Sequence, residues 1–235
     1  MVLLQYKVDP ADVKATINVN MSTSPTISLS DPTAELDLNL SLSIDSSTQE
    51  GKPITFMAEQ TVFEVHDPEY GGMDIFSRGG FGRLRNPSDP SKSISLGLFR
   101  VNSRPKNDTL DLRERGHVFY TIPGDGSPIT IIHRLSWNRI FKYEDKRTKA
   151  DLVPGETFDI GMGKGYIGTL WWCWGDMETD LKDKKLHVWR EGAYGSEKPG
   201  DDFVKDGNWM LGEAPKRLKW EDVTEGGRAS FKVVE

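Results

Sequence analysis

Residues 166–189, YIGTLWWCWGDMETDLKDKKLHVW, hold four of the seven tryptophans of this 235-residue chain and its single cysteine. Side chains in an extended segment alternate between its two faces. Alternation places Trp172 and Trp174 on one face of the segment and Trp171 on the other. A segment that is apolar on both faces is typical of a central strand that is covered on both sides. The stretch therefore predicts a β-strand at the centre of the fold.

Two interpretations of these tryptophans remain open. In the first, both faces of the strand are buried and every tryptophan is a core residue. In the second, the Trp172 face is buried, and the Trp171 face presents a large, rigid aromatic surface to a ligand. If there is a ligand surface, we expect these aromatic residues to form it: Trp171, Trp172, Trp189 and Tyr194.

The sequence after the tryptophans predicts a turn, a short helix and a loop. Gly175 ends the strand, and the carboxylate of Asp176 is suited to cap the free N–H groups of a helix over residues 176–185. Leu186 and Val188 return as another strand. Beyond Trp189 the chain is polar and rich in glycine, which predicts a long loop over about residues 190–215.

Residues 35–45, ELDLNLSLSID, carry the clearest strand pattern in the chain. Leucine or isoleucine occupies every second position from residue 36 to residue 44, with a polar residue between each pair. This alternation predicts a strand with one buried face and one solvated face. Further strands are predicted at residues 2–8, 13–20, 54–65, 117–122, 128–135 and 152–162.

Turn signals predict how some of these strands connect. Pro123–Gly126 separates residues 117–122 from residues 128–135, and we expect these two strands to pair. Glycines at positions 226 and 227 predict a C-terminal hairpin. Short strands, frequent turns and little helical periodicity favour one antiparallel β-sandwich domain over residues 1–235, with one or two short helices.

Several segments resemble a group of uncharacterised fungal proteins, over roughly residues 27–190. The segments are ELDLNLSLSID with PITFMAEQTVFEV, LSWNRIFKYED, LVPGETFDIGM and GTLWWCWGDMETDLKDKKL. The chain is also similar to immunoglobulin-like and arrestin-like sandwiches, through a leucine, a PGE turn and an aromatic residue, Phe158. Those folds often have a tyrosine there, whose hydroxyl ties down a corner. The resemblance implies a sandwich fold, and it implies no activity and no functional residue.

The composition limits the classes of partner that the chain is expected to bind. Thirty basic and 36 acidic side chains give a net charge of −6, and negative charge opposes binding to nucleic acid or to anionic membranes. One cysteine excludes an internal disulfide. No apolar run approaches the roughly 18 residues of a membrane span. The N-terminal apolar run is too short for a signal peptide. We therefore expect a cytoplasmic protein without a nucleic-acid or membrane partner.

Motifs for catalysis, metals and cofactors are absent from the sequence. The four histidines lack zinc-site spacing, and there is no HExxH and no GxSxG. GMGKGYIG contains Lys164, but neither Ser nor Thr follows the lysine, as a phosphate loop requires. We expect no metal and no cofactor. His133 shares a predicted strand face with Ile129 and Ile131, which indicates a structural histidine.

Two classes of function remain. The first is a non-catalytic module that recognises a small apolar or planar ligand, or a protein partner, through an aromatic face. The second is a biosynthetic enzyme of the cyclase or isomerase type, which needs a shaped apolar pocket more than a motif. His133, His187 and Asp176 are its candidate catalytic residues. A closed, tryptophan-lined pocket containing a histidine would favour the enzyme, and a solid core would favour the module.

Overall fold

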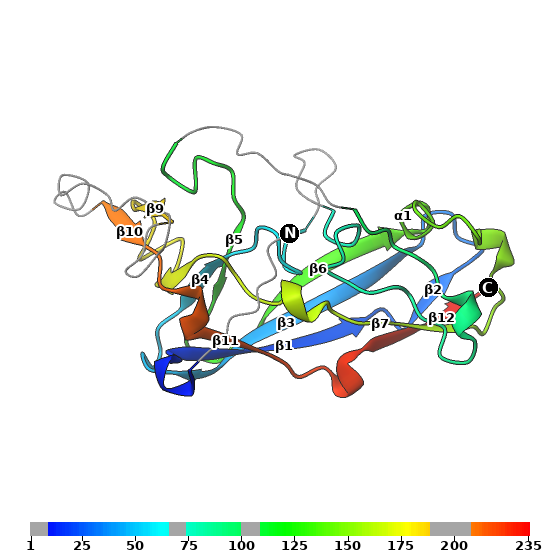
Figure 1. Cartoon of the computed structure of the whole chain (residues 1–235), viewed down its shortest axis with the longest axis horizontal. Coiled ribbons are helices and arrows are strands. Elements are labelled where there is room, and N and C mark those ends of the chain that lie inside the picture. The colour runs from blue at the N-terminus through cyan, green and yellow to red at the C-terminus, as the bar shows by residue number, and fades with distance from the viewer. Residues whose placement is uncertain (1–8, 66–73, 100–108, 189–207) are drawn as a thin grey trace.

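Figure 1 shows the computed structural model of the chain, which describes residues 9–65, 74–99, 109–188 and 208–235. These residues form twelve strands in four sheets and a single short α-helix. The protein is therefore all-β, as the sequence predicts. The predicted strand at residues 2–8 lies outside the described residues.

The largest sheet has the strand order β11-β1-β3-β6. Its strands are β1 (Ala15–Thr23), β3 (Glu35–Ser47), β6 (Ile129–Ser136) and β11 (Leu218–Asp222). β3 contains the alternating leucines, and all four from Leu36 to Leu42 are fully buried, while the polar residues between them are partly exposed. The alternation therefore predicts both the strand and its buried face.

Three smaller sheets complete the fold. One has the order β2-β12-β7, with β2 (Thr26–Ser28), β12 (Ala229–Val234) and β7 (Thr157–Ile160). Another has the order β5-β4-β8, with β5 (Phe119–Ile122), β4 (Ile54–Met57) and β8 (Trp172–Trp174). The third pairs β9 (Lys185–His187) with β10 (Trp209–Leu211). The α-helix is α1 (Trp137–Ile140). The 3-10 turns are Pro10–Asp12, Pro90–Lys92, Lys149–Asp151, η4 (Lys164–Tyr166), Pro215–Arg217 and Glu225–Gly227.

The sheet β2-β12-β7 shares one hydrophobic core with the largest sheet. Phe158 of β7 and Phe231 of β12 stack with ring centroids 5.9 Å apart. Both rings belong to the same buried cluster as the leucines of β3. Burial of these apolar faces is the main driving force that holds the two sheets together.

The predicted hairpins do not form. The strands on either side of Pro123–Gly126 lie in different sheets, because β5 pairs with β4 and β6 pairs with β3. The strands before and after Glu225–Gly227 also separate, since β11 pairs with β1 and β12 pairs with β7 and β2. A turn sequence sets a change of direction, whereas the burial of apolar faces selects each strand's partner.

Two of the four sheets, β11-β1-β3-β6 and β2-β12-β7, contain both parallel and antiparallel pairs rather than antiparallel pairs alone. Within the described ranges, β1 with β11, β12 with β2, and β10 with β9 are parallel pairs, and the other five pairs are antiparallel. β10 also lies inside the predicted loop of residues 190–215, of which residues 190–207 are outside the described residues.

The tryptophan stretch is less regular than predicted. β8 spans only three residues, and η4 replaces the start of the expected strand. The expected helix over residues 176–185 is a series of turns ending at β9. Asp176 still caps the first of these turns, because its carboxylate accepts hydrogen bonds from the N–H groups of Glu178 at 2.8 Å and Thr179 at 3.0 Å.

Candidate ligand-binding groove

Trp171 and Trp172 are both fully buried, with 0% of each side chain exposed. Trp172 belongs to the main core, where its ring lies 5.4 Å from that of Trp174. The indole N–H of Trp172 donates to the carbonyl of Ala214 at 3.1 Å, and that of Trp171 donates to the carbonyl of His187 at 2.8 Å. The expected open face at Trp171 is therefore wrong, and the interpretation of both residues as core holds.

A second apolar cluster covers the Trp171 face of the strand. It consists of Met57, Leu112, Trp171, Cys173, Leu181 and Leu186. Phe119 packs its ring edge to face with Trp171 at a centroid distance of 5.5 Å. Packing is so close that a Cβ added at Gly212 would lie 2.3 Å from the indole ring. No ligand can reach Trp171 without displacing this cluster.

His133 lies in the main core as a neutral side chain. Its Nε2 lies 2.8 Å from the carbonyl oxygen of Val62, and a carbonyl only accepts, so Nε2 carries the proton. Phe76 and Phe81 each pack edge to face with the imidazole at a centroid distance of 5.3 Å. Burial lowers the pKa of His133 to about 4, against the weaker opposing effects of the Val62 bond and of Asp74. The predicted structural histidine is thus a core residue.

His187 and Asp176 lie in other parts of the molecule. His187 is buried in β9, edge to face with Trp209 at 5.7 Å, and its pKa is lowered by burial and, to a lesser degree, by the charge of Arg115. The Asp176 carboxylate is occupied by its turn. His133, His187 and Asp176 therefore have separate partners on separate elements. None of the three lines the groove beside β11.

A groove with a cavity volume of about 520 Å³ opens beside β11. Two stretches of chain line it, residues 164–169 and residues 215–227. η4 and β11 belong to these two stretches (Figure 1). The lining residues are Lys164, Ile167, Gly168, Thr169, Pro215, Leu218, Lys219, Trp220, Asp222, Thr224 and Gly227.

Trp220 joins this groove to the core. It is partly buried, and its ring lies 5.1 Å from the ring of Phe56 and 5.0 Å from that of Phe63. Trp220 pairs with Ile17 of β1, which is fully buried, so both side chains point from the same face of the sheet. Because β11 is the outermost strand of its sheet, neighbouring strands cover Trp220 only on one side. The ring therefore keeps exposed aromatic surface in the groove.

Polar groups of the groove are mostly engaged with the protein. The Thr169 hydroxyl donates to the carbonyl of Met57 at 2.6 Å, and the Thr224 hydroxyl accepts from the N–H of Met21 at 2.9 Å. The Asp222 carboxylate accepts from the N–H of Thr224 at 3.0 Å. Lys219 forms an ion pair with Glu221. Among the described residues, Lys164 has no ion-pair partner.

A second hollow, of about 320 Å³, lies beside α1 and is smaller, with Trp137 and Phe141 as its aromatic lining residues. Trp137 lines it but is only 5% exposed, and its indole N–H donates to the carbonyl of Ser28 at 2.8 Å. The ammonium of Lys149 lies 5.3 Å from the centre of the Trp137 ring. The groove beside β11 is therefore the better candidate.

Sequence reasoning missed Trp220, although one signal pointed to it. In LKWED, Leu218 and Trp220 are apolar while the other three residues are charged. Because side chains two residues apart share a face, this pattern is typical of a strand with one apolar face. Trp189 and Tyr194, the other two predicted ligand-binding residues, lie outside the described residues.

The described ranges contain no group of three or more histidine, cysteine and acidic side chains placed to hold a metal ion. They also contain no helix with the length and apolarity that crossing a membrane requires. Comparison of the chain with protein-family models, with curated proteins and with solved structures finds no match.

Proposed function

We propose that this protein is a non-catalytic binding module that recognises a small ligand with a planar, apolar body in the groove beside Trp220. The observation that carries the proposal is the partly buried Trp220 ring, anchored against Phe56 and Phe63, in a cavity of about 520 Å³. Volumes of about 300–1,000 Å³ are usual for small-molecule sites. Tryptophan binds planar groups by offset stacking over a large, rigid apolar surface.

The chemistry of the groove supports recognition rather than catalysis. General acid–base catalysis needs a titratable group within reach of the reacting atoms, most often a histidine. No histidine among the described residues lines the groove, and both of its threonine hydroxyls are engaged with backbone groups. Its one carboxylate, Asp222, caps the N–H of Thr224, which leaves Lys164 as the titratable lining residue without a partner in the described part of the chain. An aromatic ring anchored in the core and few free polar groups are suited to holding a ligand unchanged.

The proposal extends to the type of fold. The core shared by the sheets β11-β1-β3-β6 and β2-β12-β7 supports a β-sandwich of the immunoglobulin-like or arrestin-like type. Phe158, the residue that carries the resemblance to those folds, stacks on Phe231 in the core, whereas those folds often have a tyrosine whose hydroxyl bonds to the backbone. In this interpretation the chain belongs with the fungal proteins that it resembles, and the groove lies at an edge of the sandwich.

Trp220→Leu is expected to weaken ligand binding about fivefold, because stacking on an aromatic ring is worth roughly 1 kcal/mol beyond the area that it buries. The measurement is isothermal titration calorimetry with a panel of neutral planar aromatic compounds that includes 2-naphthamide. Trp220→Phe keeps a ring in place and should retain most of the affinity.

Trp209→Leu is the matched control, because Trp209 is also partly buried but lies outside the groove. It should bind the panel as the native protein does. The proposal fails if Trp220→Leu, still folded by circular dichroism, binds every compound with native affinity. It also fails if the protein converts a bound compound at a rate proportional to its concentration.

A further inference from the structure

We propose that the ligand of the Trp220 groove is a planar aromatic carboxylate, whose single negative charge pairs with the ammonium group of Lys164. This inference rests on the proposed function and adds to it the chemical class of the ligand. Three observations carry it: the charge balance of the groove, the anchoring of the turn that holds Lys164, and the combination of one cation with one aromatic surface.

The charge balance of the groove leaves one cation without a protein counter-ion. Lys164, Lys219 and Asp222 are its charged lining residues. Lys219 pairs with Glu221, and Asp222 caps the backbone N–H of Thr224. Lys164 is exposed and has no ion pair with any residue of the described part of the chain. An anion in the groove would therefore meet one available positive charge.

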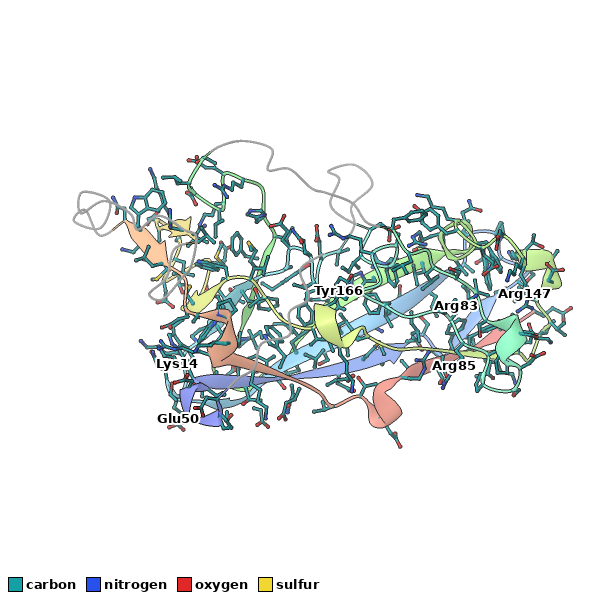
Figure 2. The ribbon with its side chains drawn as sticks, in the orientation of Figure 1. Lys14, Glu50, Arg83, Arg85, Arg147 and Tyr166 are labelled. Atoms are coloured by element: carbon teal, nitrogen blue, oxygen red, sulfur yellow. The ribbon has the colours of Figure 1, made fainter. Side chains whose placement is uncertain are left out.

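The backbone beneath Lys164 is held firmly in place. Tyr166, labelled in Figure 2, is buried, and its hydroxyl donates to the carbonyl of Arg78 at 2.6 Å. The Tyr166 N–H bonds to the carbonyl of Gly163 at 2.8 Å, and the Gly163 N–H bonds to that of Gly80 at 2.8 Å. These contacts fix η4 beside the groove. Only the Lys164 side chain must be ordered when it meets a ligand, which limits the entropic cost.

The two binding groups come from different lining segments, Trp220 from β11 and Lys164 from η4. An aromatic acid satisfies both, because its ring stacks on the indole and its carboxylate accepts hydrogen bonds from the ammonium. A dianion such as a phosphate monoester would keep one uncompensated charge near the Asp222 carboxylate, which repels it. One unpaired lysine and one aspartate in the same groove therefore favour a ligand with a single negative charge.

The test compares 2-naphthoate, which is ionised at pH 7, with 2-naphthamide, which has the same ring and no charge. Native protein should bind the naphthoate about fivefold more tightly, the upper end of what an exposed ion pair contributes. Lys164→Gln should remove this preference and leave the affinity for the naphthamide unchanged. Lys182→Gln is the matched control and should keep the preference, because Lys182 is also exposed but does not line the groove.

Equal affinity of the native protein for the two compounds would overturn the inference, and so would a preference that survives in Lys164→Gln. Both of these results leave the proposed function standing, provided that binding still depends on Trp220. Failure of both compounds to bind, or binding that Trp220→Leu does not weaken, would instead refute the proposed function itself. The calorimetric titrations thus separate the two failures.

Discussion

Trp171→Ala and Trp172→Ala are each expected to destabilise the fold by about 3–5 kcal/mol, the usual range for large aromatic truncations in a core. Each side chain is fully buried, one in each of the two apolar clusters that flank β8. Each truncation also removes an indole N–H from a backbone carbonyl, that of His187 or that of Ala214. Each carbonyl keeps a backbone N–H partner, from Gly212 or Arg217, so most of the loss comes from the cavity that the truncation leaves.

Urea denaturation at pH 7 measures both losses. Trp209→Ala, at a partly buried position, should cost clearly less and serves as the control. A severe loss in Trp172→Ala together with a near-native Trp171→Ala would show that the Trp171 face is open. Such a result would contradict the burial of β8 on both sides.

The free energy of unfolding is expected to fall by about 3 kcal/mol between pH 7 and pH 4 through His133 alone, at 1.36 kcal/mol per unit of pKa difference. Burial lowers the folded-state pKa of His133 from 6.5 to about 4. Between these values the unfolded chain binds a proton that the folded protein excludes. The stabilisation is therefore complete above pH 6.5 and is lost as the pH falls toward 4.

Urea denaturation at pH 7, 6 and 5 isolates this effect, because carboxylates titrate mainly below that range. His133→Gln does not titrate, and its amide can still donate to the carbonyl of Val62, so its stability should change much less with pH. His187→Gln is the control, since the pKa of His187 is also lowered. This variant should lose only the part of the pH dependence of stability that comes from His187. If the stabilities of His133→Gln and the native protein depend on pH in the same way, the claim that His133 is buried as a neutral imidazole is wrong.

The alternation of apolar and polar residues within one strand predicts that strand and its buried face. The leucines of β3 alternate because one face of a long strand is buried, and the structure places that face in the core. His133 lies on the same face of β6 as Ile131 and Leu135, and all three side chains are buried. Period-two burial within one strand needs no knowledge of its partners.

Features that depend on distant partners were not predictable. Trp171 is covered by residues as far apart as Met57, Leu112 and Leu186, which no local pattern links to it. Trp220 remains partly exposed because β11 is the edge strand, parallel to β1. A strand's place in a sheet depends on pairings across the whole chain. The core was therefore predictable in part, whereas the groove became visible only in the folded molecule.

The most direct test of the groove beside Trp220 follows the indole N–H signals of the protein in ¹⁵N–¹H correlation spectra during titration with 2-naphthoate. The signal that disappears in Trp220→Phe identifies Trp220. We expect the Trp220 signal to shift with added ligand until it saturates, while the signals of the buried Trp171 and Trp172 stay nearly constant. A titration in which Trp220 does not move, whether another tryptophan shifts or none does, would contradict the proposed site.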